Sequence, residues 1–130
     1  MNIMKKRHKK ALYWIIAIVA VVTAAWAINS YSNQPGELDS FAQCLEDQGA
    51  TFYGAYWCPA CNQQKTMFGR SQDLLPYEEC SLPNRGGRNE LCTGLGIEGY
   101  PTWEFPDGER VTGVVSLEEL SRKTSCELPS

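Results

Sequence analysis

The stretch FYGAYWCPACNQQKTMFG, residues 52–69, decides the fold. The apolar and aromatic run at 50–57 is typical of a buried strand. Cys58 follows as an N-cap, and Pro59 takes the first helical position, where a missing N–H costs nothing. The run from Asn62 onward reads as helix and ends at Gly69. The stretch therefore predicts a strand that leads directly into a helix, with two cysteines at the junction.

The segments on either side predict further helices and strands. Residues 38–49 read as a short helix, 74–80 as a second strand and 88–95 as a brief helix. The segments TWEF and RVTGVV flank a Pro-Asp-Gly turn at 106–108, which predicts a hairpin. Ser116 begins the last helix, and Glu119 completes a capping box. This order predicts an α/β fold, a mixed sheet flanked by helices.

The N-terminal segment differs sharply from the rest. A basic cluster within residues 1–10 precedes eighteen apolar residues at 11–28, which as a helix would span roughly 27 Å, close to the hydrocarbon thickness of a bilayer. We expect one transmembrane helix there, with the N-terminus in the cytoplasm by the positive-inside rule. A cleaved signal peptide has the same layout, and 25–27 (AWA) would suit its cleavage. Residues 29–37 read as a linker, and 38–130 as the extracytoplasmic domain.

The composition of that domain restricts its chemistry. All six cysteines follow the apolar segment, on the side where disulfides persist. Seven Lys and Arg there stand against fifteen Asp and Glu, a net charge of −8. An acidic surface of this kind argues against nucleic-acid binding, which needs a basic footprint.

Several uses of the Cys58–Cys61 pair fit the sequence poorly. Covalent haem attachment requires a histidine directly after the second cysteine, but that position is Asn62, and His8 is the single histidine. Zinc usually takes two close pairs of ligands, and no second short pair is present. A purely structural disulfide would close a tiny loop and stabilise little. We therefore expect neither a metal nor a cofactor.

Redox chemistry explains more of the local sequence. The free N–H groups and the dipole at a helix N-terminus favour a thiolate at Cys58, and the thiolate is the nucleophile in disulfide exchange. Cys61, one turn inside the helix, would be more shielded. It can attack a mixed disulfide formed at Cys58 and release the substrate.

These residues also carry a resemblance. FYGAYWCPACNQQKTMFG, together with GIEGYPTWEF at 96–105, resembles a thioredoxin-like domain. It is most similar to the one fused to, or accompanying, bacterial vitamin K epoxide reductase homologues. The similarity covers roughly residues 38–126.

The resemblance implies a membrane-anchored thiol–disulfide oxidoreductase that exchanges disulfides with exported proteins. It also implies a quinone-linked membrane partner, expected in trans. Cys58 would be the attacking cysteine, Cys61 the resolving one, and Pro101 a cis-proline that faces them. Residues that would contact the substrate are Trp57, Pro59 and Tyr100.

One position departs from the pattern of ordinary thioredoxins. Those proteins have a buried acid on the strand before the motif, and the matching residue here is Phe52, so the proton of Cys61 needs another acceptor or water.

Lys65 carries no assigned role. It stands about one turn beyond Cys61, and we expect it to be solvated.

The other four cysteines leave alternatives open. Cys80 can pair with Cys92, and Cys44 with Cys126, as structural disulfides; or Cys80 and Cys92 can act as a second relay. Two other functions also remain: a reductant for cytochrome c maturation, and a disulfide-stapled binding module without turnover.

Overall fold

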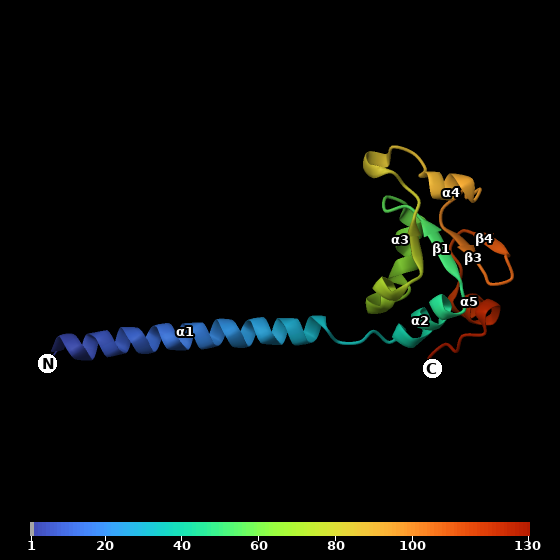
Figure 1. The fold of residues 1–130 in the computed structure, drawn as a ribbon. Helices are drawn as coiled ribbons and strands as arrows, with labels where there is room; N and C mark the ends of the chain where they lie inside the picture. Colours follow the sequence, from blue (N-terminus) through green and yellow to red (C-terminus); the bar gives the residue numbers. More distant parts are fainter. Residues whose placement is uncertain (1) are drawn as a thin grey trace. The chain divides into compact units, whose positions relative to one another are not determined.

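The computed structural model describes residues 2–130, with side chains from His8 onward (Figure 1). The chain forms two compact units, which divide between Gln34 and Pro35. Each unit has its own architecture, and the second contains all six cysteines.

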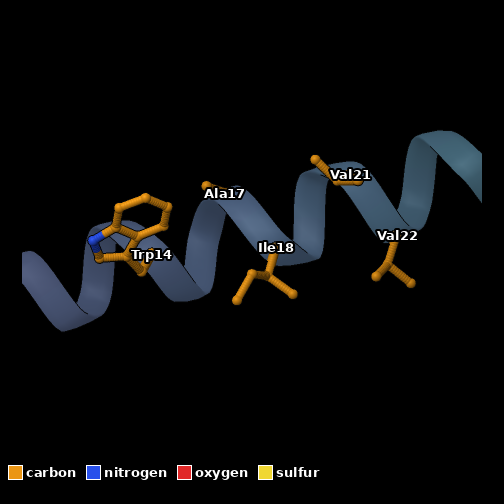
Figure 2. A pocket seen from close by; sticks show the side chains of 5 residues that line it. All are labelled: Trp14, Ala17, Ile18, Val21 and Val22. Carbon is orange, nitrogen blue, oxygen red and sulfur yellow. The ribbon is translucent and has the colours of Figure 1, made fainter.

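The first unit is the helix α1, Asn2–Ser32. Its part from His8 to Ser32 is 25 residues long and apolar enough to cross a membrane, and none of it is buried. Figure 2 shows the apolar side chains along one stretch of α1, where five of them line a shallow pocket of about 240 Å³: Trp14, Ala17, Ile18, Val21 and Val22.

The predicted linker at 29–37 needs a correction. The helix α1 continues through Ser32, four residues beyond the predicted end of the apolar segment. Polar residues such as Asn29 and Ser30 do not stop a helix that is already under way, whereas Pro35 and Gly36 do. The connection between the two units is therefore shorter than the sequence suggests.

The second unit is built on a four-stranded mixed sheet with the strand order β2-β1-β3-β4. The strands β1 and β2 are parallel, and the pairs β1–β3 and β3–β4 are antiparallel. This confirms the predicted sheet, although each strand is shorter than expected. The bounds are Thr51–Gly54 for β1, Tyr77–Glu79 for β2, Thr102–Glu104 for β3 and Arg110–Thr112 for β4.

Helices accompany the sheet as predicted. The four α-helices are α2 (Asp39–Asp47), α3 (Pro59–Thr66), α4 (Glu90–Gly94) and α5 (Leu117–Thr124). Two 3-10 helices, η1 (Gly69–Leu74) and η2 (Pro83–Arg85), lie between them in sequence. The Oγ of Ser116 accepts a hydrogen bond from the backbone N–H of Glu119, which confirms the Ser116 cap of α5. This is a thioredoxin-like α/β fold preceded by one candidate membrane helix (Figure 1).

The two faces of the sheet bury separate hydrophobic clusters. Successive strand residues point to opposite faces, so Phe52 and Tyr53 of β1 belong to different clusters. The larger cluster packs Phe52 and Trp103 against residues of α2, α3 and α5, with the two rings stacked at 5.0 Å. The smaller one packs Tyr53 against Ile97, against Cys80, which directly follows β2, and against Cys92 of α4. The cysteine pair 58–61 belongs to the larger cluster.

The helix α3 is fixed to the sheet by one buried polar side chain. Gln64 is fully buried, and its Nε2 donates to the carbonyl oxygen of Val115 at 3.0 Å. Its Oε1 accepts from the N–H of Val115 at 2.8 Å and from the indole of Trp103 at 3.2 Å. Because these bonds tie α3 to β3 and to the segment before α5, they fix the helix that carries both cysteines.

Candidate active site

The two cysteines of the 58–61 pair lie at the N-terminus of α3. Cys58 is the N-cap residue, and Pro59 is the first residue of the helix, as predicted. The backbone N–H of Cys61 donates a hydrogen bond to Sγ of Cys58 at 3.3 Å. Both are free cysteines, and Cys58 keeps 6 % of its surface exposed whereas Cys61 has none. Cys58 is therefore the cysteine of the pair that keeps some contact with solvent.

Burial separates the two sulfurs chemically as well. Burial and, next, the hydrogen bond with Cys58 raise the pKa of the Cys61 thiol to about 12. A backbone hydrogen bond from Ala55 and the charge of Lys65 act in the opposite direction but are smaller effects. Cys61 is therefore present almost entirely as the thiol at neutral pH. Any reaction at Cys61 needs a way to remove its proton.

A compact group of side chains lies behind Cys61. A Cβ added to Gly54 would lie 3.1 Å from Sγ of Cys61, 2.7 Å from Cε2 of Tyr77 and 3.4 Å from its hydroxyl oxygen. The hydroxyl of Tyr77 donates to Oε2 of Glu79 at 2.7 Å. Nζ of Lys65 lies 3.4 Å from the centre of the Tyr77 ring, so the expectation that Lys65 is merely solvated is wrong. The attraction between a cation and the face of an aromatic ring is stronger in a partly buried site than in an exposed one.

The residues beside the pair on the outer surface are aromatic. Tyr56 and Trp57 are 49 % and 38 % exposed, and Tyr100 meets the Trp57 ring edge-on at 6.2 Å. Such rings offer an apolar surface to a partner. The contacts of Trp57 and Tyr100 with a substrate stay predictions.

Each of these rings is held by the segment between Cys80 and Cys92. The indole of Trp57 donates to Oγ of Ser81 at 2.8 Å, and the hydroxyl of Tyr56 accepts from the N–H of Arg85 at 3.1 Å. Nε of Arg88 donates to the hydroxyl of Tyr100 at 3.3 Å. The segment therefore sets the positions of the aromatic residues around the pair.

The prolines predicted for the site are placed as follows. The Tyr100–Pro101 peptide bond is cis, as expected, and Pro101 is buried immediately before β3. Pro59 is exposed at the start of α3. A direct contact of Pro101 with the Cys58 sulfur, and the contact of Pro59 with a substrate, stay predictions.

The remaining four cysteines form two disulfides. Cys44 in α2 is bonded to Cys126, and Cys80 at the end of β2 to Cys92 in α4. This is the pairing that the sequence analysis set out.

Some contacts around the pair could not be read from the sequence. Gln64, Tyr77 and Glu79 were not singled out, although Tyr77 and Glu79 stand two apart on a predicted strand and so share one face. The missing information was the register, which places Tyr77 beside Phe52 and Glu79 beside Gly54. Ser81 and Arg88 lie in an irregular segment that has no sequence period.

The chain is similar in sequence to a known thiol–disulfide oxidoreductase. The thiol-disulfide oxidoreductase LTO1 of Arabidopsis thaliana is 39 % identical over 94 residues, which cover 68 % of this chain and 24 % of that protein. The chain therefore spans about a quarter of the length of this relative. No protein-family model matches the chain.

Proposed function

We propose that this chain is a membrane-anchored thiol–disulfide oxidoreductase that acts through Cys58 and Cys61. The observation that carries the proposal is the asymmetry of the pair: Cys58 caps α3 with an accessible edge, and Cys61 lies one turn deeper, fully buried. An accessible sulfur at a helix N-terminus suits attack on a substrate disulfide, and a buried neighbour suits resolution. The similarity to LTO1, named for this activity, supports the same chemistry.

The reaction is a two-step exchange. The Cys58 thiolate attacks one sulfur of a substrate disulfide, and the bond between the substrate sulfurs breaks as the mixed disulfide forms. Cys61 then attacks Sγ of Cys58, the mixed disulfide breaks, and the substrate leaves as a dithiol while the 58–61 pair becomes a disulfide. The reverse sequence oxidises the substrate. Trp57 and Tyr100 would contact the substrate beside Cys58, and Pro101 would face it from the start of β3.

The proposed location follows from α1 and from the disulfides. A helix long and apolar enough to span a bilayer, with a basic cluster before it, would leave the redox domain outside the cytoplasm. Two disulfides besides the redox pair fit such an oxidising compartment. The substrates would then be exported cysteine-containing proteins. A membrane protein like vitamin K epoxide reductase, in trans, would exchange electrons with the same pair.

The two stable disulfides have a structural role in this proposal. The Cys80–Cys92 bond closes the segment that holds Tyr56, Trp57 and Tyr100, and the Cys44–Cys126 bond joins α2 to the end of α5. Neither bonded pair would exchange with the substrate. A relay role would require Cys80 or Cys92 to open during turnover, yet both sulfurs are fully buried.

Two measurements test the proposal: catalytic turnover of a protein substrate and the reduction potential of the 58–61 pair. The full chain in detergent micelles should catalyse the reduction or the refolding of a disulfide-containing protein substrate over many cycles. A binding module would show no turnover, and that result would reject the proposal. The reduction potential of the 58–61 pair then gives the direction: a value well above about −270 mV, the potential of thioredoxin, favours oxidation of substrates. A value at or below it favours a reductant, as cytochrome c maturation needs.

A further inference from the structure

The proposed exchange leaves one proton without an assigned acceptor. Cys61 is fully buried, and it must lose its proton before its sulfur can attack the mixed disulfide at Cys58. The position on β1 where an acid would serve is Phe52, which is buried and cannot take a proton. The acceptor is therefore water or a group from another element near the Cys61 sulfur.

The neighbouring parallel strand β2 places a candidate group, the Tyr77 hydroxyl, beside the same space as the Cys61 sulfur. Gly54 has no side chain, and the space where its Cβ would stand is shared by the Cys61 sulfur at 3.1 Å and by the Tyr77 hydroxyl at 3.4 Å. The Tyr77 hydroxyl donates to Oε2 of Glu79 at 2.7 Å, so its lone pairs remain available to accept a second hydrogen bond. Oε1 of Glu79 accepts from the N–H of Ser81 at 2.8 Å, which fixes the carboxylate in this orientation.

We propose that Tyr77 takes the proton of the Cys61 thiol and passes its own hydroxyl proton to Glu79. The inference rests on the proposed disulfide exchange, and it assigns Tyr77 as a catalytic residue and Glu79 as its positioning partner and final acceptor.

The step balances as follows. The Cys61 sulfur forms a bond to Sγ of Cys58, and the bond from Cys58 to the substrate breaks, its electron pair leaving with the substrate sulfur. The Cys61 proton moves to the phenolic oxygen of Tyr77 while the phenolic proton moves to Oε2 of Glu79. The leaving thiolate later takes up a proton from Glu79 through solvent. The 58–61 pair is oxidised and the substrate reduced, and the same groups return the proton to Cys61 in the opposite direction.

The charged and titratable groups around this path favour it. From α3, Lys65 lies over the Tyr77 ring, where its charge offsets negative charge that develops on the phenol or on Cys61. From η1, Asp73 lines a surface pocket of about 430 Å³ together with Lys65 and Tyr77, which gives the path access to water. Cys58 and Glu79 are the other titratable groups beside the path. Burial, and then the hydrogen bond to Glu79, raise the pKa of Tyr77 well above its ordinary value, so the phenol stays protonated at neutral pH and keeps an O–H to donate to Glu79.

The strand β2 also contains a matched control. Glu78 is adjacent to Glu79 in sequence and carries the same charge, but it lies on the opposite face of the sheet, paired in register with Tyr53. The substitution Glu78→Gln therefore removes a carboxylate from the same strand without touching the path. Tyr77→Phe removes one oxygen and keeps the ring beneath Lys65, and Glu79→Gln keeps an oxygen for the N–H of Ser81.

The test measures the resolution step by itself. The full chain in detergent micelles, reduced at the 58–61 pair, is mixed with the aromatic disulfide 5,5′-dithiobis(2-nitrobenzoate). Release of the first thionitrobenzoate reports attack by Cys58, and the slower, concentration-independent release of the second reports attack by Cys61. The rate constant of the second release is recorded from pH 6 to 9 for the wild type and for the three variants.

The proposal predicts distinct pH profiles. The wild type and Glu78→Gln should share a profile that changes little across this range. Tyr77→Phe and Glu79→Gln should be slower on the order of a hundredfold at pH 7, as expected for loss of a general base, and should rise about tenfold per pH unit. Profiles of Tyr77→Phe and Glu79→Gln that coincide with the wild type would overturn the proposal. If a variant does not fold, the pH profile of the wild type tests the proposal. A wild-type rate constant that rises about tenfold per pH unit would exclude an internal proton acceptor.

This failure is distinguishable from failure of the proposed function. A wild type that turns over protein substrates while the variants keep its profile rejects the Tyr77–Glu79 path alone. If the wild type and the variants show the predicted pH profiles with the small disulfide, but the wild type does not turn over protein substrates, the proposed function is rejected and the Tyr77–Glu79 path is retained.

Discussion

The backbone N–H of Cys61 points at Sγ of Cys58 and donates a hydrogen bond to it over 3.3 Å. The bond caps α3 with a sulfur instead of the oxygen that Ser, Thr or Asp would offer. It directs a donor and the N-terminal end of the helix dipole at the sulfur that is accessible. The same short turn buries Cys61 completely, so that one hydrogen-bonded turn gives the two cysteines different environments.

This difference predicts selective alkylation. In the reduced full chain, iodoacetamide at pH 8 should modify Cys58 and leave Cys61 unmodified, because Cys61 is buried and its pKa is raised to about 12. Peptide mass spectrometry with time gives the extent at each site. In the Cys58→Ser variant, Cys61 should still resist alkylation at pH 8. Equal rates at the two sites would contradict the account.

The raised pKa of Cys61 also predicts how stability depends on pH. The folded chain binds this proton more tightly than the unfolded chain, whose thiol has the ordinary value of 9.0. The stabilising contribution is therefore complete below about pH 9 and is lost as the pH rises toward about 12. Urea unfolding of the reduced chain should show a stability that falls over this interval. The chain with an oxidised 58–61 pair lacks this thiol and is the control. Its stability should fall less, because only groups common to both forms, such as Tyr53 and Tyr77 with their raised pKa values, still contribute. An equal decline in both forms would contradict the assignment.

Gly54→Ala is predicted to destabilise the fold and disturb Cys61. The added Cβ would stand 2.7 Å from Tyr77 and 3.1 Å from the Cys61 sulfur, and overpacking of this kind costs about 1–3 kcal/mol. Gly94→Ala is the control, because a Cβ there meets nothing within 4 Å and should leave stability unchanged or slightly higher. Urea unfolding followed by tryptophan fluorescence distinguishes the two. Equal stabilities would show that the space beside Gly54 is not filled as described.

Gln64→Leu is predicted to cost at least about 2 kcal/mol of unfolding free energy. The substitution leaves the N–H and carbonyl of Val115 and the indole of Trp103 buried without their partner. Gln63→Leu makes the same change at an exposed position of the same helix and should lie near the wild type. The unfolding free energies in urea are compared. A Gln64→Leu variant as stable as Gln63→Leu would show that these bonds do not hold α3.

Sequence patterns anticipated the elements of the second unit more accurately than their contacts. Pro59 after Cys58, the Pro-Asp-Gly turn at 106–108 and the Ser116 cap are local signals, and each one placed an element correctly. The strands came out shorter because aromatic runs such as 50–57 continue past the last paired residue, Gly54, into the turn before Cys58.

What sequence patterns missed depends on partners distant in the chain. Gln64 reads as one more polar residue of an exposed helix until Trp103 and Val115 are placed around it. The expectation that Lys65 is solvated failed for the same reason, since only the packing of α3 on β2 brings it over Tyr77. Positions within α3 follow from its helical period, whereas the register of β2 against β1 follows from the whole fold.

The two disulfides predict a selective response to reductant. Chain-entropy estimates for sequence separations of 82 and 12 give roughly 4.5 kcal/mol for Cys44–Cys126 and roughly 3 kcal/mol for Cys80–Cys92. Cys80, Cys92 and Cys126 are buried, and Cys44 is half-buried. Mild dithiothreitol should therefore open an oxidised 58–61 pair and leave both bonds intact, as differential alkylation and mass spectrometry would show. Opening of Cys80–Cys92 together with the 58–61 pair, and loss of exchange in Cys80→Ala, would instead indicate a relay.

The most direct test of the central claim is the trapping of substrates by the two single-cysteine variants. Full-length Cys61→Ser should accumulate mixed disulfides through Cys58, because no buried thiol remains to release the substrate. These adducts should be visible on non-reducing gels and should disappear after reduction with dithiothreitol. Full-length Cys58→Ser should form none and should not turn over a disulfide-containing protein. Wild-type turnover by Cys58→Ser, or equal trapping by both variants, would contradict the account of Cys58 as the attacking sulfur and Cys61 as the resolving one.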